Sequence, residues 1–164
     1  MTAAYDFRFD ALQGGDLPLS RFAGRPLLIV NTASRCGFTP QYAGLQQLWV
    51  EQRHTGLVLI GVPCNDFGAQ EPGSEAEIST FCATRFGVDF PLTAKAHVRG
   101  PERHPLFIWL AEQGGFLSRP RWNFYKYLID REGRLTGWFT FLTRPDAPRL
   151  RQAVDRLVMG SNGL

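Results

Sequence analysis

The sequence of 164 residues lacks a CxxC pair, and it has too few cysteines for a disulfide framework. Its three cysteines, Cys36, Cys64 and Cys82, are far apart. Their odd number and wide spacing argue against a small domain held by several disulfides and against a thioredoxin-type dithiol. The histidines lie at no ligand spacing relative to the cysteines, so we expect no metal site. Free thiols of this kind are typical of a reducing compartment.

The sequence also has no dense basic run, no long apolar run and no secretory leader. A net charge of +3 without a basic patch or motif predicts no nucleic-acid partner. No segment approaches the length of a membrane span, and the first ten residues lack the basic-then-apolar order of a signal peptide. Hydrophobic content of 44% is ordinary for a globular protein. We therefore expect residues 1–164 to form a single domain in the cytoplasm.

Apolar patterning predicts an α/β protein. Continuous apolar runs at residues 27–30 and 57–62 are typical of strands buried on both faces of a parallel sheet. Apolar residues recur at helical spacing between them, which predicts a right-handed βαβ unit with Gly56 as its helix stop. A capping box at Ser74 begins a further helix, and Gly87 is suited to end it.

The remaining elements predict a mixed sheet. Helices are expected over residues 74–86, over 105–113 and from Thr143 onward, and strands over 125–130 and 135–139 around a hairpin turn. Apolar residues on either side of Gly14 and Gly15 predict a short N-terminal β-hairpin. This order is compatible with a thioredoxin-like fold, in which helices cover both faces of a mixed central sheet.

Cys36 comes directly after the first apolar run. Thr39 is a good helix N-cap and Pro40 suits the first helical position, so Cys36 is predicted to lie in a strand-to-helix loop. Backbone N–H groups and the positive end of a helix dipole favour a thiolate there, and a thiolate is a competent nucleophile. The alternative is that Cys36 is a small buried apolar residue, as many free cysteines are.

Three segments carry a family resemblance. Residues 31–39 (NTASRCGFT), 62–73 (VPCNDFGAQEPG) and 122–126 (WNFYK) resemble the three active-site motifs of the glutathione peroxidase family, in its cysteine-containing, thioredoxin-dependent branch. The likeness covers nearly the whole chain and implies a thioredoxin-like fold. It departs at Asp66, where the family usually has Gln, and at Thr32, where Val is common.

The resemblance implies a catalytic tetrad of Cys36, Gln70, Trp122 and Asn123. Side-chain amides and an indole N–H are donors that stabilise a thiolate and a developing oxyanion. Each of the three donors also has an ordinary structural interpretation. Gln70 and Asn123 are suited to turns, and Trp122 to an apolar core.

The resemblance assigns Cys82 as the resolving cysteine, which condenses with a Cys36 sulfenic acid to form a Cys36–Cys82 disulfide. Cys82 falls on the apolar face of its helix, so a purely structural role is the alternative. We interpret Cys64 as structural because it follows a buried strand. Lys126 belongs to the third motif, but a surface lysine at a strand edge is equally compatible with the sequence.

These features predict a peroxidase that reduces hydrogen peroxide and organic or lipid hydroperoxides, without metal or organic cofactor. Thioredoxin is the expected reductant, with glutathione as the alternative. Two other hypotheses are a peroxide sensor that passes its disulfide to a partner protein, and a thioredoxin-fold binding module without activity. Family members that form tetramers carry an inserted loop before Trp122. Its absence here predicts a monomer whose Cys36 is open to bulky partners.

Overall fold

The computed structural model describes residues 2–160. Its helices are α1 (Gln41–Gln52), α2 (Glu75–Phe86), α3 (Pro105–Gly114) and α4 (Pro148–Met159). Its strands are β1 (Arg8–Asp10), β2 (Asp16–Pro18), β3 (Leu27–Thr32), β4 (Val58–Pro63), β5 (Lys126–Ile129) and β6 (Leu135–Phe139). Short 3₁₀ turns lie at Ala4–Asp6, Leu19–Phe22, Arg53–Thr55 and Phe116–Ser118.

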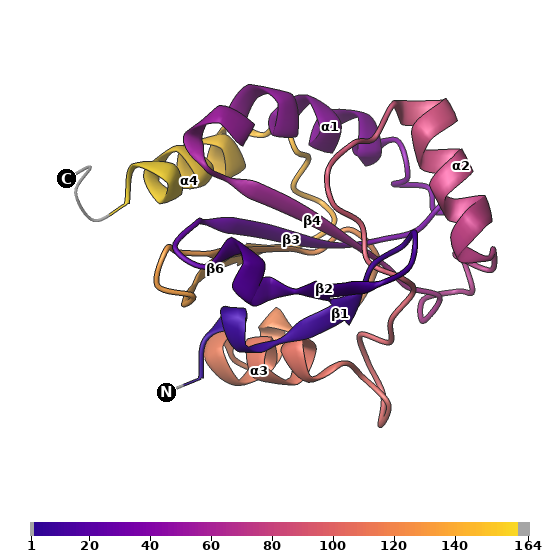
Figure 1. Ribbon diagram of the computed structural model, residues 1–164, viewed down its shortest axis with the longest axis horizontal. Helices are drawn as coiled ribbons and strands as arrows, with labels where there is room; N and C mark the ends of the chain where they lie inside the picture. The colour runs from indigo at the N-terminus through magenta and orange to yellow at the C-terminus, as the bar shows by residue number, and fades with distance from the viewer. Residues whose placement is uncertain (1, 161–164) are drawn as a thin grey trace.

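The central sheet has four strands in the order β4-β3-β5-β6 (Figure 1). β3 pairs in parallel with β4 and antiparallel with β5, and β5 pairs antiparallel with β6. β1 and β2 form the antiparallel N-terminal hairpin that the glycine-centred pattern predicts, with Phe9 opposite Leu17. The mixed sheet, its flanking helices and this hairpin confirm the expected thioredoxin-like architecture.

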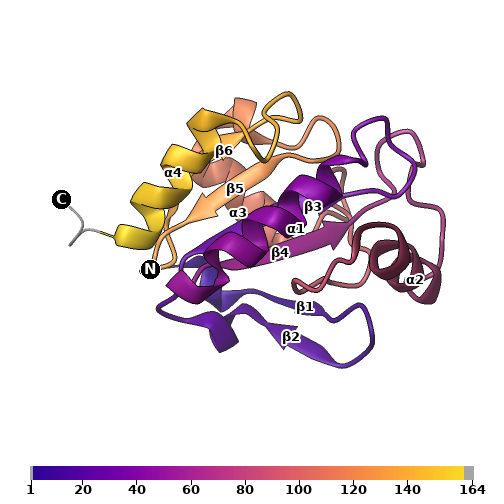
Figure 2. The same cartoon turned by 90° about the horizontal axis from the view of Figure 1, so that it is seen from above.

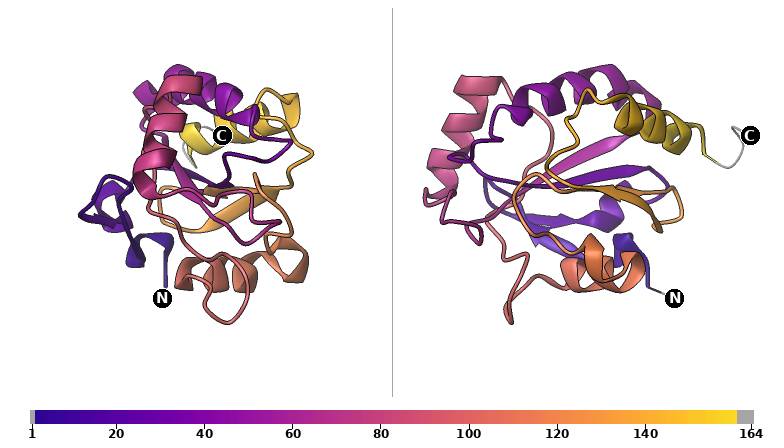
Figure 3. Two further views of the ribbon diagram at one scale, coloured as in Figure 1. Left: turned by 90° about the vertical axis from the view of Figure 1, so that its right-hand side faces the viewer. Right: turned by 180° about the vertical axis from the view of Figure 1, so that it is seen from behind.

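The core is divided by the sheet into two layers. Leu28 and Val30 of β3 pack with α1, α2 and α4, whereas Leu27 and Ile29 pack with α3 and the hairpin. This alternation follows from the two-residue side-chain period of a strand. Figure 2 shows α1 and α4 in front of the sheet with α3 behind it, and Figure 3 shows the same helices on opposite sides of the sheet.

Two predicted helix starts are wrong. Thr39 does not cap α1, which begins at Gln41, because its hydroxyl accepts from the Cys36 N–H at 2.9 Å and donates to the Ala33 carbonyl at 2.8 Å. The last helix begins at Pro148 rather than at Thr143. The capping box of α2 is confirmed, with Ser74 as N-cap.

The surface interpretation of Lys126 is also wrong, because its side chain is fully buried. Its Nζ donates to Gln41 Oε1 at 2.6 Å and to the carbonyl oxygen of Thr143 at 2.6 Å. Gln41 Nε2 in turn donates to the Phe141 carbonyl at 2.8 Å. These bonds connect the start of α1 to the segment between β6 and α4. No carboxylate among the described residues pairs with this amine.

Lys126 gives the folding stability a specific pH dependence. Burial lowers its pKa to about 7, whereas the amine of an unfolded chain titrates near 10.4. Between these values the unfolded chain binds more protons, so stability rises as the pH rises. We expect the free energy of unfolding to increase by about 1 kcal/mol between pH 7 and pH 8 because of this group. Urea titrations of the wild type and of Lys126→Met at both pH values measure the difference. An equal increase in both proteins would contradict the assignment.

Candidate active site

The three motif segments meet at one edge of the central sheet. Cys36 lies in the loop after β3, Gln70 in the segment after β4, and Trp122 and Asn123 just before β5. Because β3 and β4 are parallel and β5 is antiparallel to β3, the ends of the first two strands lie beside the start of the third. In Figure 2 the arrow of β4 points to this edge, where α2 also lies.

Cys36 is held by backbone contacts and is 7% exposed. Its Sγ accepts a hydrogen bond from the Phe38 N–H at 3.4 Å, and its own N–H is bonded to Thr39. This N–H places one backbone donor at the sulfur, and α1 begins five residues further on, at Gln41. The short connection before Trp122 predicts an accessible Cys36, but the side chain is buried. A bulky partner therefore reaches the sulfur only after the Cys36 loop or a segment packed against it moves.

Gln70 and Asn123 are in direct contact. Asn123 is fully buried, and its Nδ2 donates to Gln70 Oε1 at 3.0 Å. The Gln70 carbonyl accepts from the Arg35 N–H at 2.9 Å, which connects this segment to the residue preceding Cys36. The amide pair therefore lies next to the loop of Cys36, and the Gln70 amide keeps its own N–H donors for another acceptor.

Trp122 is half-buried beside the same segment. Its ring is tilted against Phe67, with ring centroids 5.9 Å apart, and it approaches Gly68. It packs against both layers of the core, including the layer that contains Cys36. Its indole N–H makes no hydrogen bond to another described residue. That donor remains available to a ligand.

Asn31, which no sequence pattern marks as functional, positions the third motif. It is fully buried, one residue before the end of β3. Its Nδ2 donates to the Trp122 carbonyl at 2.9 Å, and its Oδ1 accepts from the Tyr125 N–H at 3.0 Å. Its backbone carbonyl accepts from the Phe124 N–H at 2.6 Å. The signal that could have identified it is a polar residue that directly follows the apolar run of a buried strand.

The backbone is strained on both sides of the amide pair. Ala69 has φ +52° and Phe124 has φ +64°. A bulky residue in this left-handed region is uncommon, and such conformations persist only where the surroundings enforce them. Asn31 provides that enforcement at Phe124, so the direction of the Asn123 side chain is fixed by the core.

Cys64 and Cys82 are both free thiols and are each 1% exposed. Burial raises the pKa of Cys64 to about 12 and that of Cys82 to about 11. The Tyr42 hydroxyl opposes the shift at Cys82. Cys82 lines a cavity of about 450 Å³ between α2 and the N-terminal hairpin. Both thiols are therefore protonated near neutral pH, and Cys82 is enclosed.

A smaller cavity, of about 170 Å³, separates the Cys36 loop from α2. Ser34 lines it on the loop side and Phe81 on the side of α2. Glu71, which follows Gln70, also lines it, and burial raises the pKa of its carboxyl group. This cavity and the side chains that line it therefore lie between α2, which carries Cys82, and the Cys36 loop.

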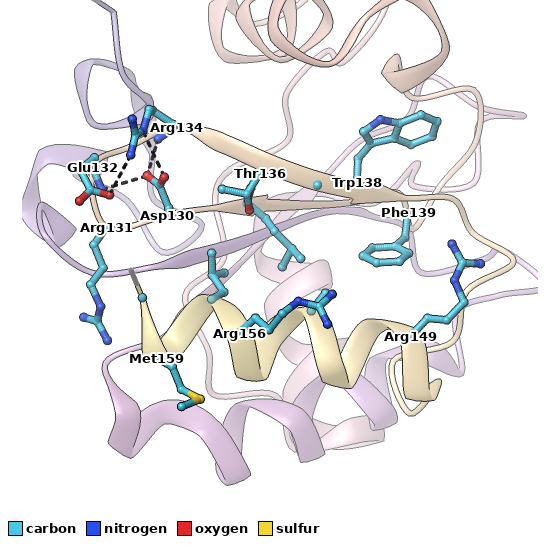
Figure 4. A pocket seen from close by; sticks show the side chains of 15 residues that line it. Asp130, Arg131, Glu132, Arg134, Thr136, Trp138, Phe139, Arg149, Arg156 and Met159 are labelled. Atoms are coloured by element: carbon cyan, nitrogen blue, oxygen red, sulfur yellow. Dashed lines mark hydrogen bonds and ion pairs between the residues drawn. The ribbon is translucent and has the colours of Figure 1, made fainter. Parts of the chain in front are cut away.

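Another cavity, of about 600 Å³, opens between β6 and α4 (Figure 4). Arg149 and Arg156 line it from α4 and Phe139 lines it from β6, while Arg134 pairs with Asp130 at one end. None of its lining residues belongs to the three motif segments. Among the described residues there is also no cluster of His, Cys, Asp or Glu that could hold a metal ion, and no helix there is long and apolar enough to span a membrane.

Known proteins are similar to this chain over most of its length. The hydroperoxy fatty acid reductase gpx1 of Synechocystis sp. is 46% identical over 150 residues, covering 87% of this chain and 89% of that protein. The glutathione peroxidase-like peroxiredoxin gpx1 of Schizosaccharomyces pombe is 40% identical, covering 89% and 94%. The crystal structure of T. cruzi GPX1 is similar, with a TM-score of 0.76, 31% identity and coverage of 98% of this chain and 99% of that one. The family model described as glutathione peroxidase matches residues 4–111, and the chain belongs to the glutathione peroxidase family.

Proposed function

We propose that this chain is a thiol peroxidase in which Cys36 reduces hydroperoxides and Cys82 resolves the product. The observation that carries the proposal is the meeting of three loops at one sheet edge. Cys36 there has a backbone N–H at its sulfur, and the neighbouring Gln70–Asn123 pair is held by a 3.0 Å hydrogen bond. Trp122 adds an unused indole donor beside them.

In the proposed peroxide step, the Cys36 thiolate attacks the terminal oxygen of the hydroperoxide. The S–O bond forms as the O–O bond breaks, and the departing oxygen takes a proton and leaves as an alcohol, or as water from hydrogen peroxide. Donors aimed at the departing oxygen stabilise its developing charge. Gln70, Trp122 and Asn123 supply donors of this kind without introducing a titrating group.

In the proposed resolving step, Cys82 gives up its proton and its sulfur attacks the Cys36 sulfenic acid. The hydroxyl group leaves with that proton as water, and a Cys36–Cys82 disulfide remains. A reduced dithiol such as thioredoxin then restores both thiols by exchange, and its own thiols are oxidised. Glutathione is the alternative reductant.

Hydroperoxides, including those of fatty acids, are the proposed substrates because one relative is named a hydroperoxy fatty acid reductase. The decisive experiment compares turnover of hydrogen peroxide and of a fatty acid hydroperoxide with two reducing systems, thioredoxin with its reductase and glutathione with its reductase. We expect turnover mainly with thioredoxin, by a monomer that forms one domain. Equal or faster turnover with glutathione would overturn the reductant assignment, and no turnover with either would overturn the peroxidase assignment.

The amide pair provides a separate test of the peroxide step. Gln70→Ala or Asn123→Ala removes one preorganised donor, which typically costs about 3 kcal/mol of transition-state stabilisation, or roughly a hundredfold in rate. We expect stopped-flow oxidation of Cys36 to slow by about this factor, while reduction of the preformed disulfide is unchanged. Oxidation at the wild-type rate in both variants would contradict the role of the amides.

A further inference from the structure

Cys64 lies at the centre of a chain of side-chain contacts that ends at the amide pair. Asn31 Nδ2 lies 3.9 Å from the Cys64 sulfur, and the sulfur lies 3.7 Å from Asn123 Oδ1. Asn123 Nδ2 then donates to Gln70 Oε1 at 3.0 Å. All of these side chains except the half-buried Gln70 are shielded from bulk solvent.

The first member of this chain has only one possible amide orientation. Asn31 Oδ1 accepts from the Tyr125 N–H, and Asn31 Nδ2 donates to the Trp122 carbonyl. A flipped amide would place two donors together and two acceptors together, which is unfavourable in a buried site. The backbone of the third motif therefore directs Asn31 Nδ2 towards Cys64.

The orientation of Asn31 decides which group donates and which accepts in the two contacts that follow, from Cys64 to Asn123 and from Asn123 to Gln70. The Cys64 sulfur receives the Asn31 N–H on one side, so its own proton is directed to Asn123 Oδ1 on the other. Burial raises the pKa of Cys64 to about 12, so this proton is retained at neutral pH. With Oδ1 turned to the thiol, Asn123 Nδ2 faces Gln70 Oε1, and Gln70 Nε2 remains unused.

We propose that Cys64 is a positioning residue whose thiol donor fixes the orientation of the Asn123 amide, so that Gln70 presents an N–H donor rather than a carbonyl oxygen to the reacting atoms. If Asn123 were flipped, Gln70 would have to flip as well to keep their hydrogen bond. Its carbonyl oxygen would then face a thiolate and a developing oxyanion, both of which it repels. The inference rests on the proposed function, because it acts through Asn123 and Gln70.

The test removes the donor and then restores it. Cys64→Ala should slow the oxidation of reduced protein by hydrogen peroxide, followed by stopped-flow tryptophan fluorescence, by about tenfold, within the range of interaction energies between members of one network. Cys64→Ser restores an O–H donor and should recover most of the rate. Thermal unfolding checks that the variants are folded, and Cys64→Val offers a donor-free side chain of larger volume if the alanine variant is not.

A double-mutant cycle separates positioning from a general structural role. In an Asn123→Ala background, Cys64→Ala should cause no further slowing, because the group that it orients is absent. Three outcomes would each overturn this inference and leave the proposed function standing. Cys64→Ala could react at the wild-type rate, or Cys64→Ser could be as slow as Cys64→Ala. The third is that the slowing caused by Cys64→Ala and that caused by Asn123→Ala add in the double variant. A wild-type rate in Asn123→Ala itself would overturn the proposed role of the Asn123 amide together with this inference.

Discussion

Replacing Cys36 with serine is expected to abolish hydroperoxide reduction while the protein stays folded. The sulfur occupies a small buried site, with a backbone donor at 3.4 Å, that a hydroxyl group fills without crowding. A serine hydroxyl is a far weaker nucleophile than a thiolate at neutral pH, and no base among the described residues contacts this position to activate it. Turnover in a thioredoxin-coupled assay should fall to the uncatalysed background.

The control for this variant is its own stability. Thermal and urea unfolding of Cys36→Ser should match the wild type closely, since the bonds from Thr39 to the loop involve backbone atoms of residue 36. Substantial residual turnover by a purified, folded Cys36→Ser protein would remove Cys36 from the mechanism. It would also leave the peroxidase assignment without a nucleophile, because burial raises the pKa values of both other thiols.

Replacing Cys82 with serine is expected to preserve the first peroxide turnover and to eliminate thioredoxin-supported cycling. Oxidation of Cys36 by the hydroperoxide does not require Cys82. Conversion of the Cys36 sulfenic acid to a disulfide does require it. A disulfide requires Cα atoms within about 7 Å of each other. Cys82 lies on the buried face of α2, behind the cavity that separates this helix from the Cys36 loop. We therefore expect α2 to unwind locally when the disulfide forms.

Features of α2 permit that unwinding. Thr80 and Thr84 are mediocre helix formers, and the Thr84 hydroxyl donates to the Thr80 carbonyl at 2.7 Å, a contact that slightly destabilises helices. Ser79, Cys82 and Ala83 of α2 line the cavity of about 450 Å³. Because these side chains face this cavity, fewer packing contacts are lost when α2 unwinds. The N-terminal capping box at Ser74 and Glu77 should remain as the fixed end of the moving segment.

Two measurements test the resolving role. Mass spectrometry of the peroxide-treated wild type should find a Cys36–Cys82 linkage, and hydrogen exchange over residues 79–86 should become faster in the oxidised protein than in the reduced one. The Cys82→Ser protein provides the matched control, because its α2 should keep the same exchange rate with and without peroxide. A Cys36–Cys64 linkage, or a persistent Cys36 sulfenic acid beside a free Cys82 thiol, would exclude Cys82 as the resolving residue.

Much of the fold follows from local sequence signals. The capping box of α2, the glycine stop after it and the two hairpins each depend on residues close together in the chain, so their positions were predictable. The apolar runs likewise predicted β3 and β4. At each wrong helix start, a nearby residue or contact replaces the predicted cap. Thr39 uses its hydroxyl within the Cys36 loop instead of capping α1, and Pro148 rather than Thr143 provides the start of α4.

The site was predictable only as separate motifs. The contact between Gln70 and Asn123 joins residues 53 positions apart, and neither side chain alone differs from an ordinary turn residue. Asn31 and Lys126 illustrate the same limit. Asn31 bonds to backbone atoms, and Lys126 bonds to the Gln41 side chain and to a backbone carbonyl. These partners lie far away in the sequence, so composition and spacing suggest neither burial nor partners.

The burial of Lys126 also makes the protein convenient to label chemically. Lys95 and Lys126 are the two lysines of the sequence, and only Lys95 is partly accessible. Of the two lysines, an amine-reactive dye or support will therefore attach at Lys95, away from the buried amine. Acylation of Lys126 requires the segment that contains Thr143 to separate from the start of α1. The rate at which Lys126 is modified therefore reports how often these two segments separate.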